Sequence, residues 1–441
     1  MLTCFGIRKG DGNRPICTNC QRKDRQCQWI CDVGSPRVSE RLISPPALVA
    51  EHREEYISTQ DPEQALQDPQ VAQVFRHYIR DLAGWYDLND GNRHFKDVIP
   101  ARARRNPLLL SAILAFSAAN LSHTAPNFES HNFAEFYHLD CVQRLISVTK
   151  NLDSLSNEET LAAICLLRSY EIISQDFGSQ NHLQGCYSLV VNHHIELSTD
   201  LFSAGFWNYL REDITVSLIK QRDLMIDLST WSLPQTPSND SDFANYITFL
   251  LGKVINRCLR EDLSSMDLFE WNVLKSQVQK WRESLPPSFE PIRTPGLKKQ
   301  SRFSSVWTLG DWHASSLHYY HTAMSILWLA EPTAKPSNIL QRVEDYRVLH
   351  HRLKYHATEA CSLALSSDSA PVWVNAFGPI AFCGPWLRDH GMSAEVIIEL
   401  KIWGGKTVGL PESECLFYGS ELSVANVVYV YAYQHNSLLR L

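Results

Sequence analysis

Apolar side chains recur at spacings of three and four residues through nearly all of the chain that follows Asp68. The first such series places seven apolar side chains on one face of a helix: Val71, Val74, Phe75, Tyr78, Ile79, Leu82 and Trp85. Asp68 followed by Pro69 is a typical helix start, because an aspartate caps free backbone N–H groups and proline fits the first helical position. We therefore predict an all-α body, one large helical domain over residues 60–441.

Further apolar series support this fold class and indicate helices near residues 136–148 and 206–214. Their members are Phe136, Tyr137, Cys141, Leu145 and Val148 in the first, and Phe206, Trp207, Leu210 and Ile214 in the second. Ser156 and Glu159 have the spacing of a capping box ahead of another apolar run. Residues 107–121 are the most apolar stretch, but they are too few and too rich in serine and asparagine to span a bilayer. We expect a buried helix there, and no membrane partner.

Two stretches rich in proline and serine interrupt the helical pattern, at residues 229–242 and 285–305. We predict that both are surface loops between groups of helices. Residues 427–433, with the sequence VVYVYAY, favour a strand, but a single strand has no partner.

The first residues are polar and basic and contain cysteine, so they do not resemble a signal peptide. We therefore expect an intracellular, reducing compartment, where thiols stay free or bind metal. Of the twelve cysteines, five lie in residues 1–31. The others lie singly on apolar segments and are predicted to be small buried side chains: Cys141, Cys165, Cys186, Cys258, Cys361, Cys383 and Cys415.

Residues 1–31 are a short basic segment on a chain whose formal net charge is −7. They contain six basic and two acidic side chains, and Cys17, Cys20 and Cys27 have the spacing C-x2-C-x6-C. A segment this short has too little core to fold alone, whereas a structural zinc ion held by thiolates would supply the missing free energy. We predict a zinc-organised module here, followed by a linker over residues 32–59.

The stretch GDGNRPICTNC, followed by CQW, resembles the second half of the fungal binuclear zinc cluster, the six-cysteine DNA-binding domain of fungal transcription factors. By this resemblance, Cys17, Cys20 and Cys27 are the fourth, fifth and sixth cysteines of the cluster. The first half does not match, because Gly10 stands at the position of the third cysteine and Thr3 at that of the second. In the family the first and fourth cysteines bridge both ions, so these residues cannot build the standard two-zinc cluster.

Two alternatives follow for the zinc module. In the first, Cys4 joins the three matching cysteines as the fourth ligand of a single zinc ion, and Cys31 is a substitute for Cys4. In the second, the missing half of the cluster lies upstream of Met1.

The resemblance also implies a partner, double-stranded DNA with CGG-like triplets. Arg8 and Lys9 are the candidates for contacts with guanine edges in the major groove. The candidates for phosphate contacts, which set affinity but not sequence, are Arg22, Lys23 and Arg25. Family members often form homodimers through a coiled coil, but residues 33–56 show no sustained heptads, which favours DNA binding by a monomer.

Residues 60–412 resemble the fungus-specific transcription-factor domain, an all-helical regulatory region found behind such clusters. The resemblance rests on Trp85, Asp90, Arg93, His94, Phe95 and Pro107, followed by segments such as FWNYLREDI and LHYYHTAMSILWL. It implies a nuclear regulator of RNA polymerase II genes, controlled in some members by a small-molecule effector. The alternative is a family member that has lost DNA binding and acts as an effector-binding or protein-interaction regulator.

No catalytic motif stands out, and we predict that the chain is not an enzyme. GGKT at residues 404–407 resembles part of a phosphate-binding loop, but Leu400 occupies the position of the required earlier glycine. Two other sets are interpreted as core or surface histidines and as a solvated helix start, respectively: His313, His318 and His321, and Arg102, Arg104 and Arg105.

Overall fold

The structure is a computed structural model of the 441-residue chain, which divides into two units, Met1–Glu55 and Tyr56–Leu441. It describes residues 56–408 of the second unit, except for residues 126–130, 150–157, 175–199, 230, 232, 234–236, 261–265, 295–300, 334–335 and 388. The zinc module, residues 427–433, Cys186 and Cys415 lie outside the described residues. The predictions made for them therefore stay predictions.

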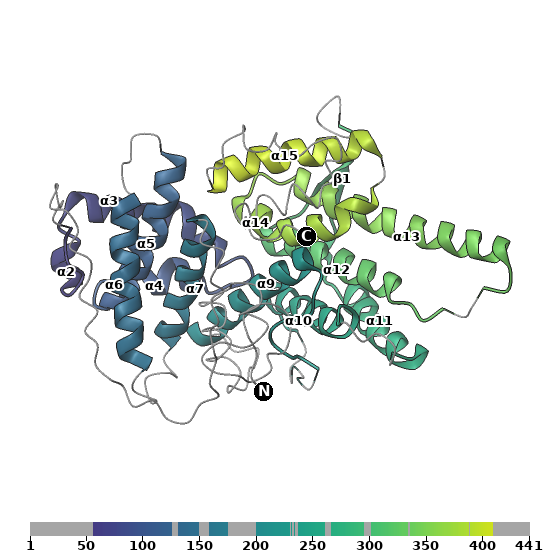
Figure 1. The fold of residues 1–441 in the computed structure, drawn as a ribbon, viewed down its shortest axis with the longest axis horizontal. Coiled ribbons are helices and arrows are strands. Elements are labelled where there is room, and N and C mark those ends of the chain that lie inside the picture. Colours follow the sequence, from purple (N-terminus) through teal and green to yellow (C-terminus); the bar gives the residue numbers. More distant parts are fainter. Residues whose placement is uncertain are drawn as a thin grey trace, which may run out of the picture. The chain divides into compact units, whose positions relative to one another are not determined.

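The first described elements run from Pro62 to Ile173 (Figure 1). They are α2 (Pro62–Ala65), α3 (Pro69–His77), η1 (Tyr78–Leu82), η2 (Ala83–Trp85), η3 (His94–Val98), α4 (Ile99–Ala103), α5 (Pro107–Thr124), α6 (His131–Thr149) and α7 (Glu158–Ile173). The remaining ones are α9 (Leu201–Lys220), α10 (Asp240–Cys258), α11 (Leu268–Glu283), η5 (Pro287–Phe289), β1 (Ile292–Thr294), β2 (Ser305–Trp307), α12 (Asp311–Leu329), α13 (Ile339–Leu365), α14 (Ala370–Cys383), η6 (Gly384–Trp386) and α15 (His390–Val408). The predicted all-α class is confirmed.

Helix α3 begins where the sequence predicts. Asp68 Oδ1 accepts hydrogen bonds from the backbone N–H groups of Gln70 at 2.9 Å and Val71 at 3.0 Å, and Pro69 is the first helical residue. The predicted apolar face is buried at Val71, Val74, Tyr78 and Leu82. The helix is not regular over this length, because α3 ends at His77 and passes through the π turn η1 into the 3-10 turn η2.

Helix α5 is buried around most of its circumference and packs against α3, α6 and α7. By length and composition alone its 18 residues are sufficient to cross a membrane, and the helix is longer than the stretch 107–121 considered from the sequence. The helix extends three residues beyond Leu121, to Thr124. Of these residues 72% are buried inside the protein, which confirms the predicted buried helix.

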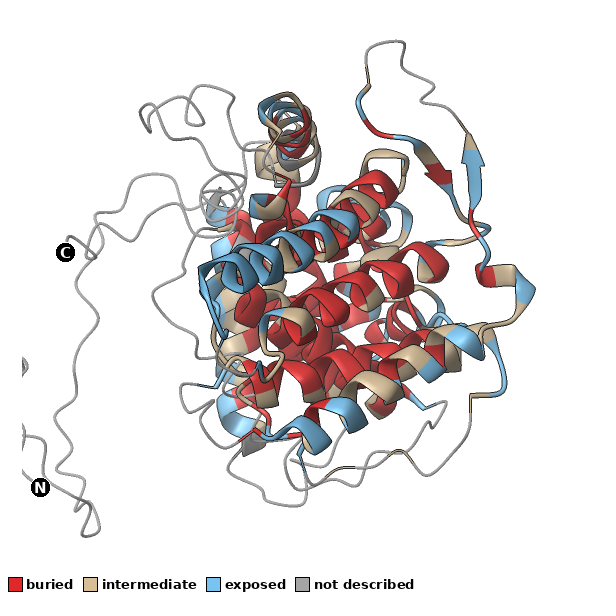
Figure 2. Cartoon of the chain, turned by 90° about the vertical axis from the view of Figure 1, so that its right-hand side faces the viewer, coloured by how far each residue is buried: buried red, intermediate tan, exposed pale blue. Residues whose placement is uncertain are grey.

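Helix α12 lies at the centre of the later helices and contacts α10, α11, α13 and α14. Helix α9 joins them to the earlier group, because it packs against α7 as well as α10 and α14. Figure 2 shows the buried residues gathered on the inner faces of these helices. The first turns of α13 differ, since Ile339 and Leu340 are each 76% exposed.

The two predicted loops contain some regular structure. Residues 285–305 include η5 and the strand β1, which pairs antiparallel with β2 so that Ile292 lies opposite Trp307. Three-residue strands are too short to show an alternating pattern, which is why the sequence did not reveal them. In residues 229–242, α10 begins at Asp240, and Asn239 Oδ1 accepts from the N–H of Asp242 at 2.9 Å.

Five predicted core cysteines are confirmed as buried and free: Cys141, Cys165, Cys258, Cys361 and Cys383. Glu159 lies in the first turn of α7, but its carboxylate accepts from Asn106 Nδ2 at 2.7 Å, and Ser156 lies outside the described residues. Arg102, Arg104 and Arg105 lie at the end of α4 and just after it, so the interpretation as a helix start is wrong.

Substitution of Gly378 in α14 by alanine is expected to destabilise the fold. A Cβ atom there would lie 2.9 Å from the backbone Cα of Thr215 in α9, so one of the two helices must move. We expect Gly378→Ala to lower the free energy of unfolding by about 1–3 kcal/mol, measured by chemical denaturation. Gly84→Ala is the control, because its Cβ would lie 3.9 Å from Pro371 Cγ. Equal stability of the two variants would contradict the close helix packing.

Candidate functional site

The predicted zinc ligands and DNA contacts all precede residue 56 and lie outside the described residues: Cys4, Cys17, Cys20, Cys27, Arg8, Lys9, Arg22, Lys23 and Arg25. Within the part of the chain that the structure describes, no group of three or more His, Cys, Asp or Glu side chains is placed to hold a metal ion. The candidate site that the structure does describe is a pocket in the helical body.

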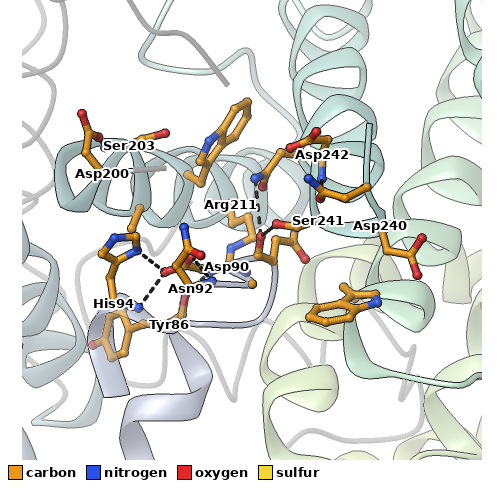
Figure 3. A pocket seen from close by; sticks show the side chains of 17 residues that line it. Tyr86, Asp90, Asn92, His94, Asp200, Ser203, Arg211, Asp240, Ser241 and Asp242 are labelled. Atoms are coloured by element: carbon orange, nitrogen blue, oxygen red, sulfur yellow. Dashed lines mark hydrogen bonds and ion pairs between the residues drawn. The ribbon is translucent and has the colours of Figure 1, made fainter. Parts of the chain in front are cut away.

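This pocket has a volume of about 510 Å³, and both polar and apolar atoms line it. It lies between the loop of residues 86–94, the first turns of α9 and α10, and the start of α12 (Figure 3). We call it the α9–α10 pocket. Its charged and aromatic lining residues are Asp90, Asp200, Asp240, Asp242, Arg211, His94, Tyr86, Trp207 and Trp312.

The loop of residues 86–94 is held by two aspartates. The Asp87 carboxylate accepts from the backbone N–H groups of Phe95 and Lys96, both at 2.8 Å. Asp90 Oδ2 accepts from the N–H of His94 at 2.8 Å and lies 2.7 Å from His94 Nδ1. Burial raises the pKa of Asp87 to about 7, against the opposing effect of the hydrogen bond from Phe95. Hydrogen bonds that two of its own aspartates accept from residues 94–96 therefore fix the conformation of the loop.

Helix α10 holds the same loop from the opposite side. Ser241 Oγ donates to the carbonyl oxygen of Asn89, and Asn245 Nδ2 donates to it at 3.4 Å. Asn89 Nδ2 donates to Thr248 Oγ1 at 3.3 Å. These bonds hold in place two residues that line the pocket, Asn89 and Asn245.

Arg211 of α9 is a buried cation at this pocket, 7% exposed. Its Nη2 donates to the carbonyl oxygen of Tyr86 at 2.9 Å and to Asn208 Oδ1. Burial lowers the pKa of Arg211, and the nearby Tyr319 and Asp87 act in the opposite direction. The guanidinium thus ties α9 to the loop that carries Asp90.

Four buried polar atoms at the pocket have no hydrogen-bond partner among the described residues: Arg211 Nη1, Asn89 Oδ1, Asn245 Oδ1 and Ser203 Oγ. A buried polar atom without a partner costs about 1–3 kcal/mol, so native proteins hold few of them. They belong to four residues that line the same pocket, but the atoms themselves are buried.

Local sequence patterns do not mark this pocket as a functional site. Of the residues that carry the family resemblance in this region, Asp90 and His94 line the pocket, but the resemblance implied no role for them. Arg211 and Asn245 showed no local signal, because each becomes a pocket residue only when α9 and α10 pack against that loop.

The three histidines of α12 are buried, which confirms their interpretation as core residues. His313 Nε2 lies 2.9 Å from Asp240 Oδ2. His321 Nδ1 lies 2.9 Å from Nδ1 of His356 in α13, whose Nε2 accepts from Trp328 Nε1 at 3.3 Å. The residues 404–407, which resemble a phosphate loop, lie inside α15.

The comparisons with known proteins agree with the predicted family. Residues 73–244 match the family described as "Fungal specific transcription factor domain". Transcription activator AMTR1 of Alternaria alternata is 21% identical, with 56% of this chain and 41% of that protein covered. The chain therefore spans about two fifths of the length of the curated relative that it matches. No solved structure matches the chain significantly.

These similarities support the prediction of a fungal transcription factor. The family match includes the loop of residues 86–94, α9 and the first turns of α10, so the α9–α10 pocket is built mainly within it. The zinc module lies before residue 73 and stays a prediction.

The buried histidines predict a loss of stability in acid. Burial lowers the pKa of His356 to about 4, whereas an unfolded histidine titrates near 6.5. Between these values the unfolded chain binds a proton that the folded chain does not, so the free energy of unfolding decreases as the pH falls. Desolvation has the same effect on His318, whose pKa is about 4. It also lowers the pKa of His321, and the nearby Arg282 and Arg293 contribute.

We expect His356→Gln to reduce the pH dependence between pH 6.5 and 4 by up to about 1.4 kcal/mol per pH unit, measured by urea denaturation. His351→Gln, at an exposed position of the same helix, is the control. A pH dependence identical in both variants would contradict the role of the buried imidazole.

Proposed function

We propose that the chain is a DNA-binding transcription regulator of the fungal zinc-cluster type, acting in the nucleus on RNA polymerase II genes. The observation that carries this proposal is the match of residues 73–244 to the fungal specific transcription factor domain, behind a basic segment with the spacing C-x2-C-x6-C. A basic segment on a chain with a net charge of −7 supports separate roles for the two parts of the chain. The basic residues 1–31 bind the DNA polyanion, and the acidic helical body regulates this binding.

Zinc is the cofactor of this proposal, held by Cys17, Cys20 and Cys27 with Cys4 as the fourth ligand. Thiolates are the form that binds metal, so ligand cysteines need an accessible, ionisable site. Cys383 and Cys361 of the body do not meet this requirement, because burial raises the pKa of Cys383 to about 11 and raises that of Cys361 further. Their burial supports the choice of the N-terminal cysteines as the zinc ligands.

Binding to double-stranded DNA follows from the charge of the same segment. Arg8 and Lys9 would contact guanine in CGG-like triplets, and phosphate contacts would come from Arg22, Lys23 and Arg25. A second candidate function is regulation without DNA binding. Gly10 and Thr3, which replace two family cysteines, favour it.

Zinc content is the first test. The full chain, purified without chelator, is expected to carry about one zinc ion, measured by elemental analysis. Cys20→Ala should lose it, and Cys361→Ala, which removes a buried body thiol, should keep it. Loss in Cys4→Ala but not in Cys31→Ala would identify the fourth ligand. A zinc-free full chain would overturn this part of the proposal.

DNA binding is the second test and separates the two candidate functions. The full chain should bind duplexes with CGG triplets more tightly than random duplexes, with an affinity that falls steeply as salt rises. Arg22→Ala should weaken binding to all sequences and reduce the salt slope by about one, whereas Arg8→Ala should relax the triplet preference. Arg105→Ala, in an exposed position of the body, is the control. Equal affinity for both duplexes would favour the regulator that has lost DNA binding.

A further inference from the structure

We infer that the first turns of α13 are a docking site for an amphipathic helix of a partner protein, one that carries acidic side chains on both sides of its apolar face. The site is the exposed apolar side of residues 339–350, which we call the α13 face. It lies outside the α9–α10 pocket, and the inference does not rest on the proposed function.

The α13 face continues the side by which the same helix enters the core. Side chains spaced alternately by four and three residues share one side of a helix. In α13 they form a single series: Ile339, Val343, Tyr346, His350, Leu353, Ala357, Ala360 and Ala364. The last four are 0% exposed, whereas Ile339 is 76%, Tyr346 51% and Val343 42% exposed. The packing side of α13 is therefore uncovered over its first turns.

The helix that covers this side ends before α13 does. His321 of α12 contacts His356, and Trp328 of α12 contacts Arg352, whose guanidinium carbon lies 4.0 Å from the ring centroid. The two helices thus run antiparallel, and α12 ends at Leu329, one residue after the second contact. Residues 339–351 extend past that end (Figure 1). A partner helix would pack on them as α12 packs on the later turns.

Basic side chains flank the α13 face. In helix pairs of this kind, the positions beside the apolar series contact the partner and select its charge. Over residues 339–354 these positions hold three cations and two leucines: Arg342, Arg347, Lys354, Leu340 and Leu349. Glu344 and Asp345 lie further round the helix, and Glu344 makes only a 3.8 Å ion pair between two largely exposed side chains. Acidic side chains of a partner would therefore meet cations on both sides.

The same charges disfavour a second copy of this chain as the occupant. In parallel pairing, Arg347 of one copy would face Arg342 of the other, and in antiparallel pairing it would face positions that hold Leu340, Arg347 and Lys354. Neither arrangement offers it an acidic partner, and like charges oppose association. DNA would pair with the cations but would leave Ile339 in water. An acidic amphipathic helix satisfies both the apolar and the charged groups.

The test uses the full chain and a synthetic peptide of about three heptads, with leucine at the core positions and glutamate at the flanking ones. Repulsion between the glutamates keeps this peptide from pairing with itself. Calorimetry should give a micromolar Kd that rises with salt, because the flanking charges are exposed. A matched peptide with lysine in place of glutamate should bind about tenfold more weakly.

Two valines of α13 form a matched pair of variants. Val343 lies on the α13 face and Val348 on the opposite side of the helix, and they are 42% and 40% exposed. Alanine favours a helix more than valine does, so neither substitution should unfold α13 or lower Tm. Val343→Ala should weaken binding of the glutamate peptide about fivefold, and Val348→Ala should leave it unchanged.

Reversal of the flanking charges tests the choice of partner. Arg342→Glu combined with Arg347→Glu should lose the glutamate peptide and bind the lysine peptide instead. Equal affinity of Val343→Ala and Val348→Ala, as attachment of the peptide to the basic residues 1–31 would give, would overturn the inference. So would no binding of the peptide, or a dimer of the chain that Val343→Ala dissociates. The zinc and DNA measurements concern other residues and are independent of these results.

Discussion

Three helices, α5, α9 and α12, carry buried residues around most of their circumference, and this constraint organises the described body. A helix of this kind must be surrounded, because no side of it can face water without a loss of hydrophobic free energy. Helix α5 is covered by α3, α6 and α7, and α12 by α10, α11, α13 and α14. Helix α9 contacts members of both groups, so its own burial joins them.

The α9–α10 pocket is a consequence of that junction. Helix α9 brings a buried guanidinium to the loop of residues 86–94, and α10 brings an amide to the same loop from the other side. Neither helix can withdraw its polar group without breaking apolar packing elsewhere. Four polar atoms of pocket-lining residues thus stay buried without a hydrogen-bond partner in the part of the chain that the structure describes.

Local features of the fold could be predicted from the sequence, and features made by tertiary packing could not. Spacing and residue type reveal features that depend on neighbours in the chain. These include the helix cap at Asp68, the apolar face from Val71 to Leu82 and the burial of α5. The strands β1 and β2 and the exact end of α5 carry no such local pattern. The pocket joins residues 86–94, 203–211 and 239–245, which no single segment encodes. The family resemblance marked the loop correctly but could not assign it a role.

The exposed start of α13 has a thermodynamic consequence of its own. Ile339, Leu340 and Tyr346 are more than half exposed, whereas Leu353 and Ala357 further along the same helix are fully buried. The opening free energy of the first turns is therefore a small fraction of that of the last turns. Amide hydrogens near residue 340 are expected to exchange with solvent by local fraying, whereas those near residue 357 exchange only when the core opens. One helix thus belongs to two cooperative units.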